Sequence, residues 1–254
     1  MKIAIISDIH ANNSALSAVL KDININKVDL IICLGDVATL GPSPREVIAT
    51  LKKLNCPCII GNHEEALFYP DNAEEYDIKG KLLNDTIYWC LDNIDSSDLN
   101  FLKKFESTKI IDLDNNKTMY CYHGTPSSTT GSIYSESEEE QLDKIFQEVG
   151  ETIRIAVGGH THVQMVRQYR NMFVVNPGSV GCAFKFPFNT PPSVPSLSPF
   201  AEYAIVESRD DNLSVQLKKV SYDIKEYITT LKNSTLPLKD WWLDEYYQLG
   251  HKIG

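Results

Sequence analysis

Five of the six histidines in this sequence directly follow an apolar, strand-like run of residues. A carboxylate or amide side chain accompanies several of them at the same kind of position. Any one such position is more typical of a helix cap, a turn or a structural histidine, but the whole set together indicates a shared site. The side chains that qualify for this site are Asp8, His10, Asp36, Asn62, His123, His160 and His162.

The donor atoms in this set suit a catalytic metal centre. Imidazole nitrogens with carboxylate and amide oxygens bind Zn²⁺, Fe, Mn²⁺ or Ni²⁺, whereas closed structural zinc sites more often use cysteine thiolates. Seven ligands are too many for one ion that keeps an open position for substrate. Two ions that share Asp36 would use all seven, so we expect two divalent transition-metal ions per chain.

Glycine stands beside most of these positions, including Gly35, Gly61 and Gly159. Because glycine lacks a Cβ, it lets the backbone turn sharply and allows a ligand to approach closely. Asp8 and His10 lie two residues apart, so their side chains would point the same way if strand geometry continued through them.

The elements that must position these side chains begin with three apolar, β-branched runs. They predict strands at Ile3–Ile6, Leu30–Leu34 and Cys56–Ile60. Apolar residues at helical spacing fill both intervals, after a cap at Asn12-Asn13-Ser14 and from Pro44 onward. This β-α-β-α-β order is typical of a parallel sheet, in which ligands bind beyond the carboxyl ends of the strands.

The rest of the chain completes an α/β fold that we expect to be a single domain over residues 1–254. Residues 64–106 read as mainly helical and are interpreted as a cap beside the sheet. Residues 182–200 contain five prolines and are expected to form a loop. A further helix is expected at about Glu138–Glu148. The later strands are predicted at Lys117–Tyr122, Arg154–Val157, Phe173–Val175, Tyr203–Val206 and Leu213–Val220.

The composition excludes several classes of partner. A net charge of −10, without a basic stripe, makes extended nucleic acid an unexpected partner. The apolar runs are far shorter than the roughly 18–20 residues that span a bilayer. Met1-Lys2 leads straight into the apolar run at Ile3 without the pattern of a signal peptide, so we expect no export. We therefore expect a cytoplasmic protein without membrane contact, and the composition leaves its oligomeric state open. Its six cysteines are expected to be thiols there, including the close pair Cys56-Pro-Cys58, which we interpret as structural.

Taken in order, these motifs resemble the full series of the calcineurin-like metallophosphoesterases. Further short segments are similar to a bacterial and archaeal branch of small phosphodiesterases and diadenosine-tetraphosphatase-like proteins. The main motifs are Asp8-Ile9-His10, Gly35-Asp36, Gly61-Asn62-His63-Glu64, His123 and Gly159-His160-Thr161-His162. The further segments are Ser7–Asn12, Gly41-Pro42, His123-Gly124-Thr125-Pro126 and Asn176-Pro177-Gly178-Ser179. The resemblance covers about residues 1–225.

The resemblance implies a metallophosphoesterase-like β-sandwich flanked by helices and two metal ions, of which manganese is favoured. Two such ions would lower the pKa of a bridging water and clamp the phosphoryl oxygens during in-line attack by hydroxide. His63 would then protonate the leaving oxygen or stabilise its charge. Asn12 would contact phosphate or, equally well, cap a helix. The first ion would be held by Asp8, His10, Asp36 and His162, and the second by Asp36, Asn62, His123 and His160.

We therefore predict a hydrolase that cuts a small phosphodiester or a dinucleoside polyphosphate. A phosphoprotein phosphatase and a non-catalytic metallophosphoesterase-like scaffold are the alternatives, and loss of a ligand or of His63 would have favoured the scaffold. The chain departs from the family pattern at Val37-Ala38-Thr39-Leu40, where glycine and an aromatic residue are frequent. It also lacks a frequent arginine after Ser179, for which Lys185 is a substitute or simply a solvated lysine. The aromatic segment Asp240–Tyr247 is either a partner surface or part of the chain's own core.

Overall fold

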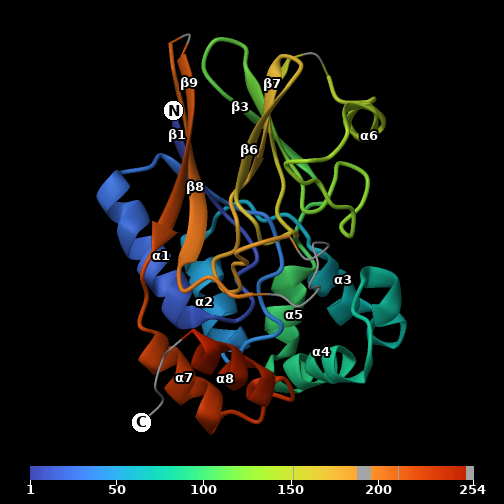
Figure 1. Ribbon diagram of the computed structural model, residues 1–254, viewed down its shortest axis with the longest axis vertical. Helices are drawn as coiled ribbons and strands as arrows, with labels where there is room; N and C mark the ends of the chain where they lie inside the picture. The colour runs from blue at the N-terminus through green and yellow to red at the C-terminus, as the bar shows by residue number, and fades with distance from the viewer. Residues whose placement is uncertain (151, 188–195, 211, 250–254) are drawn as a thin grey trace.

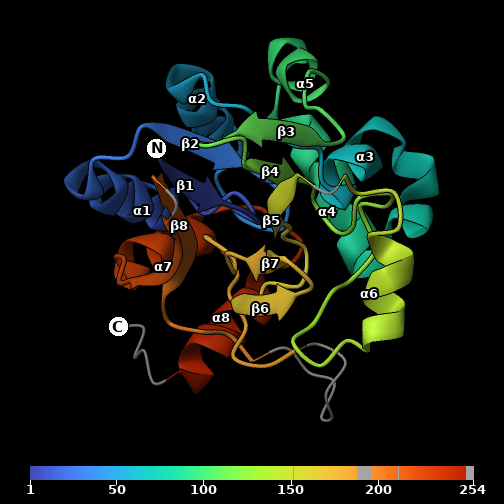
Figure 2. The ribbon, with the colours of Figure 1, turned by 90° about the horizontal axis from the view of Figure 1, so that it is seen from above.

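Two β-sheets pack face to face and carry helices on their outer faces (Figures 1 and 2). The computed structural model describes residues 1–150, 152–187, 196–210 and 212–249. The arrangement confirms the predicted α/β sandwich with flanking helices.

The first sheet has four strands in the order β2-β1-β8-β9. Strands β1 (Lys2–Ile6) and β2 (Leu30–Cys33) run parallel, as the β-α-β pattern predicts. Strand β8 (Ala201–Arg209) pairs antiparallel with β1, and β9 (Asn212–Val220) pairs antiparallel with β8. The N-terminal strand thus lies between a strand that follows it closely and one that comes almost 200 residues later.

The second sheet has five strands in the order β3-β4-β5-β7-β6. Its three central strands β4 (Thr118–Cys121), β5 (Ile153–Val157) and β7 (Met172–Asn176) are parallel. Antiparallel edge strands flank them, β3 (Lys109–Asp112) on one side and β6 (Met165–Tyr169) on the other. All carboxyl ends of the central strands therefore lie at the same edge of the sheet.

Alternation along each strand divides the apolar side chains between two layers. In β1, Ile3 and Ile5 join the core between the two sheets, whereas Ala4 and Ile6 face the helices. The inter-sheet core continues across the second sheet through residues such as Met119 and Ile155. This double burial explains why β1 is apolar throughout rather than alternating.

The helices fall into three groups by the core that they share. The first group shares one apolar cluster with the outer face of the first sheet and includes the helical segment predicted at 64–106. Its members are α1 (Asn13–Asn26), α2 (Pro44–Leu54), α3 (Asn62–Phe68), the 3₁₀ helix η1 (Pro70–Tyr76), α4 (Lys81–Asn93) and α5 (Ser96–Leu102). Helix α6 (Glu139–Ile145) covers the second sheet, and α7 (Ile224–Asn233) packs with α8 (Lys239–Gln248) below the first group.

The structure corrects the sequence interpretation in several elements. The run Cys56–Ile60 is not a strand, because it forms only isolated bridges, from Cys58 to Cys33 and from Ile59 to Glu106. Strands β3 and β6 and helices α7 and α8 were not predicted, and α6 is shorter than expected. Residues 188–195 of the proline-rich segment lie outside the described residues. All six cysteines are free thiols.

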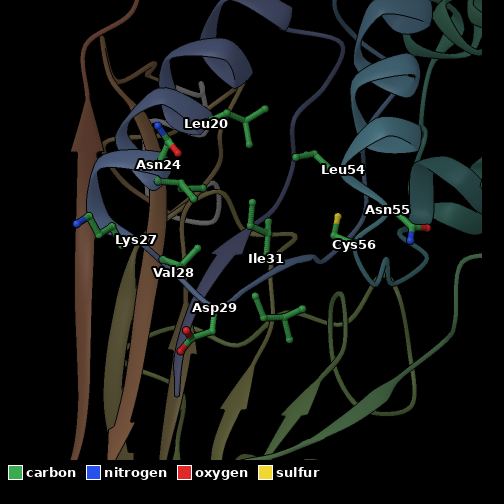
Figure 3. A pocket seen from close by; sticks show the side chains of 11 residues that line it. Leu20, Asn24, Lys27, Val28, Asp29, Ile31, Leu54, Asn55 and Cys56 are labelled. Atoms are coloured by element: carbon green, nitrogen blue, oxygen red, sulfur yellow. The ribbon is translucent and has the colours of Figure 1, made fainter.

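A pocket of about 480 Å³ lies where β2 begins, at the opposite end of that strand from the predicted ligands (Figure 3). Leu20 of α1, Leu54 of α2 and Ile31 of β2 turn into it. None of the seven candidate ligands lines it. Within the described ranges, none of the helices combines the length and the apolar character needed to cross a bilayer.

The aromatic C-terminal segment forms α8 and packs mainly into the chain's own core. Trp242 and Tyr246 are fully buried in one apolar cluster with α7, whereas Tyr247 is 50% exposed. The indole Nε1 of Trp242 also donates a hydrogen bond of 2.6 Å to the carbonyl of Leu40. The own-core alternative is therefore confirmed for Trp242 and Tyr246.

Trp242→Ala should lower the free energy of unfolding by about 3–5 kcal/mol, because it empties a buried site of this size. Tyr247→Ala is the matched control from the same helix and should change stability by less than about 0.5 kcal/mol. Urea denaturation of both variants measures the difference. Equal stability of the two would show that α8 does not depend on its buried face.

Candidate metal centre

The predicted ligands do meet at one edge of the sandwich, where parallel strands end. Asp8 comes two residues after β1, and Asp36 comes three residues after β2. His123 follows β4 and His160 follows β5 at similar distances, whereas Asn62 is the first residue of α3. Both sheets thus contribute, because their parallel strands point the same way.

Left-handed backbone conformations aim these side chains into the site. The φ angles are 53° at Asp8, 46° at His10, 55° at Asp36, 67° at His160 and 59° at His162. Strand geometry therefore does not persist from β1 through Asp8 and His10, and the expected reason for their common direction is wrong, although the side chains do converge. Each such non-glycine residue costs about 1–3 kcal/mol, which only a well-supported site sustains.

One group of donor atoms consists of Asp8, His10, Asp36 and His162, all within 4.8 Å of one another and all buried. His162 Nε2 lies 3.2 Å from Asp8 Oδ1 and 3.0 Å from His10 Nε2. His10 Nε2 lies 3.9 Å from Asp36 Oδ2. Donor atoms around one tetrahedral ion would stand roughly 3.3–3.6 Å apart, so this spacing suits a single cation.

A second group contains Asp36, His123 and His160, with Asn62 between them. His123 Nε2 lies 3.4 Å from Asp36 Oδ2 and 3.1 Å from Asn62 Oδ1. His160 Nδ1 lies 3.1 Å from the same Asn62 oxygen. Within the described residues, Asp36 is the only side chain that both groups share.

The state of the donor atoms fits cations at both places. Asp8 Oδ1, which faces the first group, is buried and forms no hydrogen bond, which is costly for a polar atom that lacks another partner. The Nδ1 atoms of His123 and His162 donate to the carbonyls of Leu34 and Cys182, at 2.6 and 2.8 Å. Their Nε2 lone pairs are thereby turned toward the centre, the usual arrangement for metal-binding histidines.

The electrostatics of the site keep its carboxylates ionised. Burial alone would raise the pKa of Asp36, but the neighbouring His123 and His63 outweigh it and hold that pKa well below its usual value. Burial would likewise raise the pKa of Asp8, but His162 holds it below normal. Burial lowers the pKa of His160 to about 4, with a further contribution from the His123 charge. Two anionic carboxylates and the neutral imidazole of His160 are forms that bind cations. Despite burial, Asp36 raises the pKa of His123 to about 9 and Asp8 raises the pKa of His162 well above normal, so a bound cation must displace a proton from each of these two rings.

Glu64, quoted in the motif series without a role, holds the Asp36 turn in place. Its fully buried carboxylate accepts hydrogen bonds from the backbone N–H groups of Asp36, Val37 and Gly61, at 2.7, 2.9 and 3.0 Å. Burial, with the Asp36 charge, raises the pKa of Glu64 to about 7. Gly61 is required here because a Cβ would stand 2.1 Å from Asp36 Oδ1.

The Asn176–Ser179 segment supports the other ligand loops. Asn176 Nδ2 donates to the carbonyl of Gly159 and to Thr161 Oγ1, at 2.6 and 3.0 Å. Ser179 Oγ donates to the carbonyl of Asp8 at 2.7 Å. The motif was visible in the sequence, but the contact of Ser179 with Asp8 spans 171 residues and could not be read from it.

His63 and Asn12 take different places from the ligand groups. His63 belongs to neither group, yet its Nε2 lies 4.0 Å from Asp36 Oδ2. Asn12 caps α1 by accepting from the N–H of Ala15 at 3.0 Å, and it donates to the carbonyl of Gly181. The N-cap interpretation of Asn12 is confirmed. Its amide oxygen and its amide nitrogen each have a hydrogen-bond partner within the chain. Lys185 is exposed.

A helix-flanked sandwich with buried imidazole and carboxylate donors at its strand ends defines a metal-dependent hydrolase. The chain belongs to the calcineurin-like phosphoesterase superfamily, whose domain model matches residues 1–190, and it is a metal-dependent phosphoesterase.

Relatives extend this similarity over nearly the whole chain. An uncharacterised protein of Methanocaldococcus jannaschii is 28% identical over 265 aligned positions, which cover 98% of each chain. The crystal structure of a metallophosphoesterase from Sphaerobacter thermophilus has a TM-score of 0.67 and 26% identity, and covers 91% of this chain and 93% of its own. A Pyrococcus horikoshii protein shares the fold with a TM-score of 0.78 at 21% identity, covering 93% and 94%.

Proposed function

We propose that this chain uses two divalent metal ions, with manganese favoured, to hydrolyse a small phosphodiester or a dinucleoside polyphosphate. The observation that carries the proposal is the pair of donor groups that share Asp36. A carboxylate with a donor group on each side is suited to bridge two cations, the arrangement in which both ions contact one phosphoryl group.

In the proposed reaction, different residues bind the metal ions, act on the leaving oxygen and hold the Asp36 turn. Asp8, His10, Asp36 and His162 bind one ion, and Asp36, Asn62, His123 and His160 bind the other. When bound, the ions supply a water of lowered pKa and neutralise charge on the phosphoryl oxygens. His63 directs its Nε2 toward the same centre and either donates a proton to the departing oxygen or stabilises its developing negative charge. Glu64 keeps the Asp36 turn in position.

The charge of the protein supports a compact substrate. A net charge of −10 repels polyanionic chains over most of the surface, so the proposed substrate is a small molecule. A screen of the metal-loaded protein against phosphomonoesters, phosphodiesters and dinucleoside polyphosphates tests this proposal. Turnover confined to monoesters would contradict the substrate class.

The protein should bind two metal ions per chain, since the donor atoms form two groups rather than one. Elemental analysis and titration with Mn²⁺ measure the stoichiometry, and bound ions should also raise the thermal midpoint because they bind only the folded state. Zn²⁺ and Fe²⁺ serve as parallel titrations. A stoichiometry that stays at one or zero under saturation would refute the two-metal mechanism.

A further inference from the structure

The ring of His63 is held from the side opposite to the metal centre. Its Nδ1 forms a hydrogen bond of 2.7 Å with the hydroxyl Oγ1 of Thr39, while its Nε2 faces Asp36 Oδ2 at 4.0 Å. A hydrogen bond between Nδ1 and the Thr39 hydroxyl therefore leaves Nε2 as the ring nitrogen that points toward the metal centre. Thr39 lies in the stretch where the chain departs from the family pattern, so the family motifs do not assign it a role.

This anchor is itself firmly placed. Thr39 is 1% exposed and His63 is 8% exposed, so water has little access to the bond between them. On one side of Thr39, Glu64 accepts from the N–H of Val37; on the other, Trp242 donates to the carbonyl of Leu40. Helices α3 and α8 therefore clamp the backbone on both sides of the hydroxyl.

A hydroxyl suits this position because it can both donate and accept. When Nδ1 carries no proton, the Thr39 hydroxyl donates to it, and when Nδ1 is protonated, the same oxygen accepts. The hydrogen bond therefore persists whichever protonation state His63 has. A group that orients a histidine through its second nitrogen in this way keeps the first nitrogen aimed at its target.

We propose that Thr39 is a positioning residue that fixes the His63 ring with Nε2 toward the metal centre. The inference deepens the proposed function, on which it rests, because it specifies how the proposed acid is held for the departing oxygen. Thr39 touches neither the substrate nor the metal ligands in this role and acts only through His63.

The test compares Thr39 variants in the full-length protein, loaded with Mn²⁺ for the kinetics and with diamagnetic Zn²⁺ for the spectra. Thr39→Val removes the hydroxyl at nearly constant volume and should lower kcat about tenfold for an alkyl phosphodiester, a part of the roughly 10²–10⁴-fold that a positioned acid supplies. The loss should shrink to about twofold or less for a nitrophenyl phosphodiester. Thr39→Ser keeps a hydroxyl and should restore most of the rate. Thr86→Val is the matched control, because Thr86 is also buried but bonds the Leu83 carbonyl in α4.

A double variant and imidazole spectra test whether Thr39 affects turnover through His63. In a His63→Gln background, Thr39→Val should cause no further loss, since a residue that acts through His63 has nothing left to position. In ¹⁵N spectra of the imidazole groups, the Nδ1 signal of His63, assigned by its absence in His63→Gln, should move in Thr39→Val and stay in Thr39→Ser.

The outcomes separate this inference from the proposed function. If His63→Gln itself shows no dependence on the leaving group, the acid role of His63 fails. If His63→Gln shows that dependence but Thr39→Val behaves like Thr86→Val, only the role of Thr39 is overturned. An additive loss in the double variant, or an unmoved Nδ1 signal in Thr39→Val, would also overturn it.

Discussion

Asp36→Asn should lower turnover by at least about 10³-fold and reduce the metal content from two ions to one or none. Asp36 Oδ2 faces His123 Nε2 at 3.4 Å and His10 Nε2 at 3.9 Å, and these two histidines belong to different donor groups. Asparagine is nearly isosteric but uncharged, so both proposed ions lose part of their neutralising charge. Metal centres supply several kcal/mol of transition-state stabilisation, and about 4 kcal/mol corresponds to 10³-fold.

The same substitution at another buried aspartate provides the control. The Asp98 side chain is 10% exposed, pairs with Lys52 at 2.6 Å and contacts no candidate ligand. Asp98→Asn should keep two ions and nearly full turnover. Circular dichroism should show that both variants remain folded. Full two-metal occupancy with unchanged turnover in Asp36→Asn would show that Asp36 is not the bridge.

His63→Ala should lower turnover on the order of 10²–10⁴-fold, the range that positioned acid–base groups contribute. Metal content and folding should stay close to normal, since His63 belongs to neither donor group. The loss should be large for an alkyl or nucleoside leaving group, whose oxygen needs a proton as it departs. It should shrink for a nitrophenyl phosphodiester, because that leaving group hardly needs one.

His123→Ala is the informative comparison for His63→Ala. His123 is a proposed ligand with its Nε2 3.4 Å from Asp36 Oδ2, so its removal should strip metal and slow all substrates alike. Equal defects across leaving groups in a His63→Ala protein that retains both metals would refute the acid assignment. Absence of activity in the metal-loaded wild type on any phosphoester would overturn the enzymatic assignment in favour of the scaffold alternative.

The chemical identity of the site could be read from the sequence. Aspartate, asparagine and histidine recur where apolar runs end. Parallel strands bring such ends to the same edge of a sheet, so their convergence did not depend on predicting the other elements. The strands β1, β2, β4, β5, β7, β8 and β9 were predictable for a related reason. Each contains a short apolar or β-branched run, which is typical of a buried strand.

Short and weakly patterned elements were not predictable. The run Cys56–Ile60 has strand composition but gains only isolated bridges, because its neighbours in space are a strand end and the residues after α5. Helices α7 and α8 mix aromatic, charged and apolar residues, and their burial depends on one another and on Leu40. Such elements are stabilised by partners that are remote in the sequence.

The sequence by itself therefore predicted the donor set, the class of chemistry and the positions of most strands along the chain. The division of the donors into two groups that share Asp36 was already implied by the family resemblance, and the described structure brings the same side chains together. Only the tertiary structure decided that left-handed turns rather than strand geometry aim Asp8 and His10. It alone assigned Glu64 to the Asp36 turn and Thr39 to the His63 ring. The physical reason is that local pattern reports which residues are buried or polar, whereas distances between side chains depend on how both sheets pack together.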